Sequence, residues 1–163
     1  MVRTKGQMTE TDQVFKTLRE PIAAEMSVAV LIDGQSASAS EIVAGALQDL
    51  DRGAVVGQRS YGKGLVQQTR PLAYGAQLKL TVSKYYTPSG RCIQAFDYSD
   101  NARGKRLDAT KRTEFKTANG RKVFDGGGVD PDILAGNGEI SPVLYSLVRN
   151  GALFDFARSY VAK

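Results

Sequence analysis

Residues 28–57 read VAVLIDGQSASASEIVAGALQDLDRGAVVG, and they predict a strand, a helix and a second strand. The run at 28–32 is continuously apolar and of strand length, which is typical of a strand covered on both faces. From 41 to 50 apolar residues recur at helical spacing, and 54–57 is a second short buried strand. Because the connections are short, we expect parallel strands in a layered α/β core.

Beyond this unit the apolar pattern changes to a period of two. Residues 65–70 and 77–86 alternate polar and apolar side chains, and they predict a β-hairpin that turns at residues 74–75. A further turn is expected at 87–90, and 91–94 is compatible with one more strand.

Three other segments have helical character. Residues 9–20 show a weak helical pattern that stops at Pro21. Ser141-Pro142 is a good helix start, because serine caps a helix and proline fits its first position. The apolar residues between 153 and 161 predict a last helix.

The composition is that of one ordinary globular domain. The 163 residues are 42% hydrophobic and 24% charged. No apolar run approaches the roughly 20 residues of a transmembrane helix, and the first residues lack the apolar core of a signal peptide. The single cysteine, Cys92, excludes an internal disulfide and a cysteine-cluster zinc site. We interpret Cys92 as a strand residue, since no histidine is present to activate its thiol.

The net charge is +5, and basic side chains are concentrated in an otherwise polar excursion at 95–125. They are Arg103, Lys105, Arg106, Lys111, Arg112, Lys116, Arg121 and Lys122. The basic core has no interleaved aromatic residues and no recognition motif, so we predict no nucleic-acid partner. The favoured interpretation is a solvated insertion, and a polyanion-binding face is the alternative.

Residues 34–41, GQSASASE, place three serines where the loop after the first strand meets the helix. Unpaired N–H groups at a helix start favour developing negative charge, so a serine there suits a nucleophile with its oxyanion near the amide of Ala39. Ser36, Ser38 and Ser40 are all available, and the motif alone does not choose among them. The ordinary alternative is a capping box, in which Ser38 and Glu41 only cap the helix.

Serine chemistry in a chain without histidine requires a lysine or a carboxylate as its base. Lys63 lies between two glycines at the mouth of a strand, whereas Lys79 and Lys84 alternate along a strand as solvent-facing residues do. A lysine base must be deprotonated, which requires burial or nearby positive charge. Gln67 lies on the following strand and can orient the amine without supplying a negative charge that would keep it protonated.

A phosphate-binding loop is a rival interpretation of the same segment. Residues 57–63 match the pattern G-x-x-x-x-G-K after a short strand. Gly64 replaces the serine or threonine that would hold magnesium, and a strand pattern follows where a helix is required.

Together these motifs resemble the C-terminal processing peptidases, also called tail-specific proteases, which are serine–lysine peptidases. The match is close from Ser27 to Gln94 and includes the serine run and the motifs at 61–64 and 85–90. Residues 128–133 resemble the family's downstream motif. Several motifs in the right order make the resemblance specific.

The resemblance implies roles for individual residues. Ser38 corresponds to the nucleophile, Lys63 to the general base, Gln67 to the residue that supports the lysine, and the N–H of Ala39 to part of the oxyanion hole. It implies a serine endopeptidase that cleaves proteins or peptides at or near their C-termini, in the periplasm or cell envelope, without metal or cofactor. The implied fold is α/β and similar to the crotonases and Clp proteases, with strand–helix–strand units, an added β-hairpin and C-terminal helices.

The resemblance also predicts how the chain is divided. Residues 1–163 are expected to form one partial peptidase domain: a catalytic core at 26–94, the polar basic insertion at 95–125, and a return segment with C-terminal helices at 126–163. The family's PDZ domain and an upstream glycine-rich oxyanion segment are not found, so we expect the C-terminal part of a longer protease. The alternative function is a peptide-binding or assembly fragment that is inactive alone, and an oligomer is compatible with either.

Overall fold

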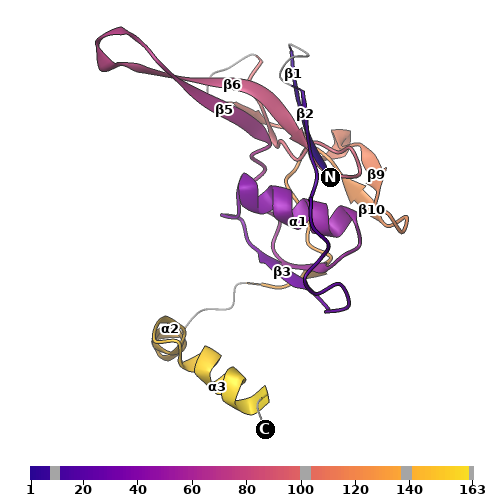
Figure 1. Ribbon diagram of the computed structural model, residues 1–163, viewed down its shortest axis with the longest axis vertical. Coiled ribbons are helices and arrows are strands. Elements are labelled where there is room, and N and C mark those ends of the chain that lie inside the picture. The colour runs from indigo at the N-terminus through magenta and orange to yellow at the C-terminus, as the bar shows by residue number, and fades with distance from the viewer. Residues whose placement is uncertain (8–11, 100–103, 137–140, 162–163) are drawn as a thin grey trace.

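The computed structural model describes residues 1–7, 12–99, 104–136 and 141–161 (Figure 1). Its strands are β1 (Val2–Gly6), β2 (Gln13–Phe15), β3 (Ala29–Ile32), β4 (Ala54–Gly57), β5 (Leu65–Pro71), β6 (Gln77–Tyr86), β7 (Phe96–Asp97), β8 (Lys105–Arg106), β9 (Glu114–Lys116), β10 (Lys122–Phe124) and β11 (Ile133–Leu134). Its helices are α1 (Ala39–Asp49), α2 (Pro142–Arg149) and α3 (Ala152–Val161), with short 3₁₀ turns η2 (Ala73–Gly75) and η3 (Ala109–Lys111).

The predicted strand–helix–strand unit is confirmed as the centre of the fold. β3 and β4 are parallel neighbours, with α1 as the connection between them, and β11 adds a third parallel strand on the other side of β4. The parallel arrangement follows from the helical crossover, which returns the chain to the same end of the sheet. Both the loop before α1 and the loop after β4 therefore lie at the carboxyl ends of the parallel strands.

The predicted β-hairpin is also confirmed. β5 and β6 pair antiparallel, with a register shift between Val66 and Gln67, and they belong to a four-stranded sheet in the order β2-β1-β6-β5. The turn falls at Tyr74 and Gly75, whose φ angles are 58° and 73°. Figure 1 shows the hairpin extending away from the rest of the molecule.

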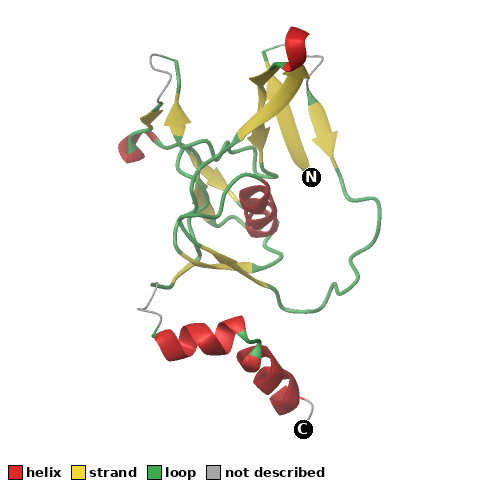
Figure 2. Cartoon of the chain, turned by 90° about the vertical axis from the view of Figure 1, so that its left-hand side faces the viewer, coloured by secondary structure: helices red, strands yellow, loops and turns green. Residues whose placement is uncertain are grey.

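Helix α1 lies between the two sheets, as Figures 1 and 2 show from two directions. A small buried core, formed by Ile32, Ala44, Val55, Ile93 and Val129, fills the space between the helix, the parallel sheet and the returning chain. The prediction that the first strand is covered on both faces is wrong for the described residues. Leu31 is 79% exposed, whereas the next residue, Ile32, is buried, so only one face of β3 is covered.

The predicted helix at 9–20 does not form in the described part of that segment. Gln13–Phe15 is a strand that pairs with β1 in antiparallel register, so long-range pairing overrides the weak local pattern. Residues 9–11 of the prediction lie outside the described residues.

Residues 91–94 form no strand, although their composition is compatible with one. Their backbone groups bond to separate loops: Thr87 N–H donates to Arg91, Gly126 N–H to Cys92, and Gly128 N–H to Ile93. Cys92 is therefore not a strand residue, which corrects the sequence interpretation.

The basic excursion is fastened to the core at several points. Arg112, whose side chain is 9% exposed, pairs with Asp130 at 2.6 Å, and Arg121 pairs with Asp51 at 2.6 Å and Asp132 at 2.5 Å. Val123 is buried. The prediction of a solvated insertion therefore holds for its exposed lysines and not for Arg112, whereas Arg121 stays 43% exposed although it is ion-paired. Arg103 lies outside the described residues.

The two predicted C-terminal helices are confirmed. The Ser141 hydroxyl caps α2 by accepting from the Leu144 N–H at 3.2 Å, and Pro142 occupies its first turn. α2 packs against α3, and neither helix contains a buried residue. Within the described ranges, none of the helices is both long and apolar enough to cross a membrane.

Candidate active site

The loop from β3 into α1 is a hydrogen-bonded turn built on one carboxylate. Asp33 Oδ1 accepts from the N–H of Gln35 at 2.9 Å, the N–H of Ser36 at 2.9 Å and the hydroxyl of Ser36 at 3.0 Å. The Gln35 N–H, followed by the two Ser36 groups, holds the pKa of Asp33 below its ordinary value. This turn ends at Ser38, the N-cap of α1.

The structure separates the three candidate serines. Ser38 has φ 57° and ψ −116°, a positive φ that is uncommon for serine and is concentrated at functional turns. The Ser36 hydroxyl is held by Asp33, and Ser40 is exposed in the first turn of α1. Ala39 is the first residue of α1, where N–H groups lack an intrahelical acceptor, as the oxyanion prediction requires. These positions favour Ser38.

Lys63 lies in the loop between β4 and β5, and its two glycine neighbours are required by close packing. Gly62 has φ +94°, and a Cβ on it would overlap Ala95. A Cβ on Gly64 would lie 2.7 Å from the backbone nitrogen of Gln94. The glycines therefore let the lysine loop lie directly against residues 94–95.

Glu41 joins the serine turn to the lysine loop. Its carboxylate is fully buried. Oε2 accepts from the N–H of Ser38 at 2.8 Å and from the N–H of Lys63 at 2.8 Å. Oε1 accepts from the Ser60 hydroxyl at 2.5 Å and from the Gly62 N–H at 2.6 Å. The half of the predicted capping box in which Glu41 accepts from the Ser38 N–H is present. It belongs to a larger arrangement in which one oxygen atom holds the backbones of both predicted catalytic residues.

Gln94 fixes the opposite side of the lysine loop. Its Oε1 accepts from the Gly64 N–H at 2.8 Å, and its Nε2 donates to the Phe96 carbonyl at 2.8 Å. The Ala95 N–H adds a bond to the Gly62 carbonyl at 2.9 Å. Gln94 has no predicted role, because nothing in its local sequence pattern shows that the chain returns to residue 64.

Gln67 is an exposed residue of β5 next to the register shift. Gln67 and Lys63 line the same cavity, so the structure brings these two predicted residues together. Among the described residues no hydrogen bond joins the side chains of Ser38, Lys63 and Gln67 to one another. Catalytic hydrogen bonds are often long in unliganded enzymes and tighten when substrate binds.

Other reactive groups in the described chain are poorly placed for chemistry. Burial raises the pKa of the Cys92 thiol, which disfavours a thiolate nucleophile. A search of residues 1–7, 12–99, 104–136 and 141–161 finds no group of three or more His, Cys, Asp or Glu residues able to hold a metal ion. The serine turn and the lysine loop are therefore the strongest candidate site.

Comparison with protein families matches residues 1–99 to the family described as peptidase family S41. A carboxy-terminal-processing protease of Bartonella bacilliformis is 47% identical over 94 residues, which are 58% of this chain and 22% of that protein. A probable CtpA-like serine protease of Staphylococcus aureus is 32% identical over 160 residues, which are 98% of this chain and 31% of that protein.

A solved structure has the same fold over most of the chain. The photosystem II D1 C-terminal processing protease superposes with a TM-score of 0.57 and 26% identity, over 83% of this chain and 27% of its own. This likeness supports the α/β architecture predicted from the sequence. The chain spans between 22% and 31% of the length of these three proteins.

Proposed function

Because the chain belongs to peptidase family S41, we propose that it carries the catalytic serine and lysine of an endopeptidase that hydrolyses proteins at or near their C-termini. The observation that carries the proposal is the Glu41 carboxylate, which holds the backbones of Ser38 and Lys63 with the same oxygen atom. The names of the relatives favour carboxy-terminal processing. We propose an extracytoplasmic location, in the periplasm or cell envelope, on the same family basis.

In the proposed mechanism, neutral Lys63 removes the proton of the Ser38 hydroxyl as the serine oxygen attacks the peptide carbonyl carbon. The N–H of Ala39 stabilises the oxyanion of the tetrahedral intermediate. When the intermediate collapses, the C–N bond breaks and the leaving amine takes the proton from Lys63, which now acts as a general acid. Lys63 then deprotonates a water that hydrolyses the acyl-enzyme and regenerates Ser38.

Gln67 is proposed to orient the Lys63 amine. A neutral amide can hydrogen-bond the amine without an opposite charge that would stabilise its protonated form. The arrangement proposed for the chain is a catalytic core at 26–94, an insertion at 95–125, and a return segment with C-terminal helices at 126–163.

The test uses a serine-reactive acylating probe and an unstructured protein substrate with the full-length protein. We expect Ser38→Ala and Lys63→Ala each to abolish labelling and lower hydrolysis at least about a thousandfold, as losses of catalytic groups do. Ser40→Ala and Lys79→Ala are matched controls, since both side chains are exposed, and both should keep wild-type rates.

Retained labelling and hydrolysis in both Ser38→Ala and Lys63→Ala would show that the dyad is assigned to the wrong residues. Assaying the 163-residue chain beside the full-length protein separates the alternative function. A chain that binds peptide without hydrolysing it, next to an active full-length protein, identifies it as a binding fragment when expressed alone.

A further inference from the structure

A cavity of about 520 Å³ opens beside Lys63, between the start of β5 and strand β7. Lys63 and Gln67 line it. Three aromatic residues, Tyr61, Phe96 and Tyr98, also line it, together with Leu65. The cavity therefore adjoins Lys63, the proposed base, and its lining combines these apolar residues with the polar side chains of Gln67, Thr81 and Gln94.

The three aromatic rings form a connected row. The ring centroids of Tyr61 and Phe96 are 5.6 Å apart, and those of Phe96 and Tyr98 are 6.4 Å apart. Tyr61 and Tyr98 are each 47% exposed, so both rings retain open surface. Exposed aromatic rings around a cavity give a ligand side chain large contact area at a low entropic cost.

The aromatic row is fixed relative to Lys63 by buried hydrogen bonds. Gln94, which also lines the cavity, links the lysine loop to Phe96, because it bonds both the Gly64 N–H and the Phe96 carbonyl. Phe96 is further held by pairing with Arg106, whose guanidinium lies 5.6 Å from the ring centroid. A cavity that is ordered before binding loses less free energy when a ligand enters.

We propose that this cavity is a substrate subsite that accepts a large apolar side chain next to the scissile bond. The inference rests on the proposed function, because Lys63 lines the cavity and would act on the bond being cleaved. Lys63 argues against an acidic substrate side chain, because a carboxylate would stabilise the protonated amine, which cannot act as a base. An aromatic or long aliphatic substrate side chain can contact the aromatic residues of the cavity, and it does not stabilise the protonated form of Lys63.

The subsite also gives the excursion a role in recognition. Phe96 and Tyr98 belong to its first residues, so the segment that begins at 95 supplies two of the three aromatic residues of the cavity. Substrate preference near the cleaved bond therefore depends on this excursion as well as on the catalytic core.

The first experiment measures binding without chemistry, using the full-length protein with Ser38→Ala. The probes are fluorescent Gly/Ala/Ser peptides with identical ends that carry a single internal Phe, Leu, Asp or Ala. By fluorescence anisotropy we expect the Phe peptide to bind about tenfold more tightly than the Ala peptide, as burial of a large apolar side chain predicts. The Asp peptide should show no such gain.

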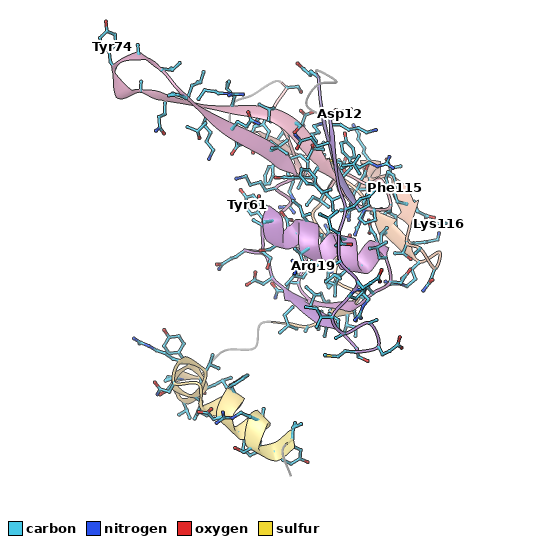
Figure 3. The ribbon with its side chains drawn as sticks, in the orientation of Figure 1. Asp12, Arg19, Tyr61, Tyr74, Phe115 and Lys116 are labelled. Atoms are coloured by element: carbon cyan, nitrogen blue, oxygen red, sulfur yellow. The ribbon has the colours of Figure 1, made fainter. Side chains whose placement is uncertain are left out.

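Tyr61→Ala and Tyr98→Ala, made in this background, should each reduce the Phe-over-Ala preference to about twofold or less. Both positions are exposed enough for the variants to fold. Tyr74→Ala is the matched control, because Tyr74 is fully exposed at the hairpin tip, far from Tyr61 (Figure 3), and it should keep the tenfold preference.

Equal affinity for the Phe and Ala peptides, or a preference that survives in Tyr61→Ala and Tyr98→Ala, would overturn the subsite. Hydrolysis by the unmodified protein is scored separately. A preference for the Phe peptide without hydrolysis supports the subsite and contradicts the proposed mechanism. Hydrolysis without that preference contradicts the subsite alone.

Discussion

Glu41 shows how much of a site can depend on one buried carboxylate. Its two oxygens accept four hydrogen bonds, three from backbone N–H groups and one from the Ser60 hydroxyl. Glu41 lies in the first turn of α1, at the positive end of the helix dipole. Since the donors come from residues 38, 60, 62 and 63, the loss of Glu41 would release both sides of the proposed site together.

Glu41→Gln should destabilise the chain and lower hydrolysis, although it changes the identity of neither Ser38 nor Lys63. The amide keeps one acceptor oxygen and turns two N–H groups toward former donors. We therefore expect about 2–4 kcal/mol less stability, from buried donors left unsatisfied. Urea unfolding of the 163-residue chain gives the stability, and a peptidase assay of the full-length protein gives the rate.

Glu114→Gln is the matched control for this substitution. Glu114 is 40% exposed and pairs with Lys122 at 2.9 Å on the surface, so its loss should change stability by less than about 1 kcal/mol. Equal effects of the two substitutions would contradict the role assigned to Glu41.

The sequence predicts only part of what surrounds Glu41. The pattern S-x-x-E predicts the contact with Ser38, because both residues belong to one helix turn. The bonds to Ser60, Gly62 and Lys63 depend on where the following strand returns, and no local pattern contains that information. The same limit explains why Gln94 had no predicted role.

At the scale of elements, α1 is held at both ends by charged groups. Asp49, near its C-terminal end, pairs with Arg91 at 2.9 Å, and both side chains are fully buried. Asp49 also accepts from the Ser89 N–H at 3.0 Å, and Arg91 donates to Gln48 at 2.7 Å and to the Phe124 carbonyl at 3.2 Å. This cluster joins the helix to the turn after β6 and to β10.

Asp49→Ala should cost about 3–5 kcal/mol of stability, because it leaves the Arg91 charge buried and uncompensated. Thermal or urea unfolding measures the change. The double variant Asp49→Leu/Arg91→Met should recover part of the loss, since removing both charges removes the desolvation penalty.

Asp155→Ala controls for the loss of an aspartate as such. Asp155 pairs with Arg158 at 3.7 Å, and both side chains are more than half exposed, so less than about 1 kcal/mol is expected. A small effect of Asp49→Ala would show that water or a rearranged neighbour compensates Arg91.

Elements with strong local patterns were predicted correctly, and those fixed by distant pairing were not. β3 is a continuous apolar run of strand length. Apolar residues recur at helical spacing in α1 and alternate with polar residues in β5 and β6. Val14 and Phe15 fit a helix or a strand equally well, and pairing with β1 decides between them. The separate loop partners of residues 91–94 prevent the strand that their composition allows.

Across the whole molecule, several aspartates share the chemistry of Asp33. The Ser99 N–H lowers the pKa of Asp97, and the Thr110 N–H lowers the pKa of Asp108. Burial raises the pKa of Asp51, but the Asn119 N–H and Arg121 more than offset it. Each carboxylate binds its proton less readily in the folded chain than in the unfolded chain.

The stability of the molecule should therefore fall in acid. Because the folded pKa values are depressed, the unfolded state takes up more protons as the pH falls, so the stabilisation is complete above about pH 5 and is lost through and below about pH 4. We expect the Tm of the wild type to exceed that of Asp33→Ala/Asp97→Ala/Asp108→Ala at pH 7.

The Tm difference should close as the pH approaches about 2, where all three carboxylates are protonated. Differential scanning calorimetry at intervals across this range measures it. A difference that stays constant with pH would mean that the three carboxylates stabilise the fold without a change in proton affinity.

The shared carboxylate at position 41 has a consequence for recognising inactive members of this family. A related chain can keep a serine and a glycine-flanked lysine at the matching positions and still lack the acceptor that orients both backbones. We expect such a chain to be a pseudoenzyme, although its nucleophile and base are intact in an alignment. Annotation of activity in distant homologues should therefore require the acidic residue in addition to the proposed serine–lysine pair.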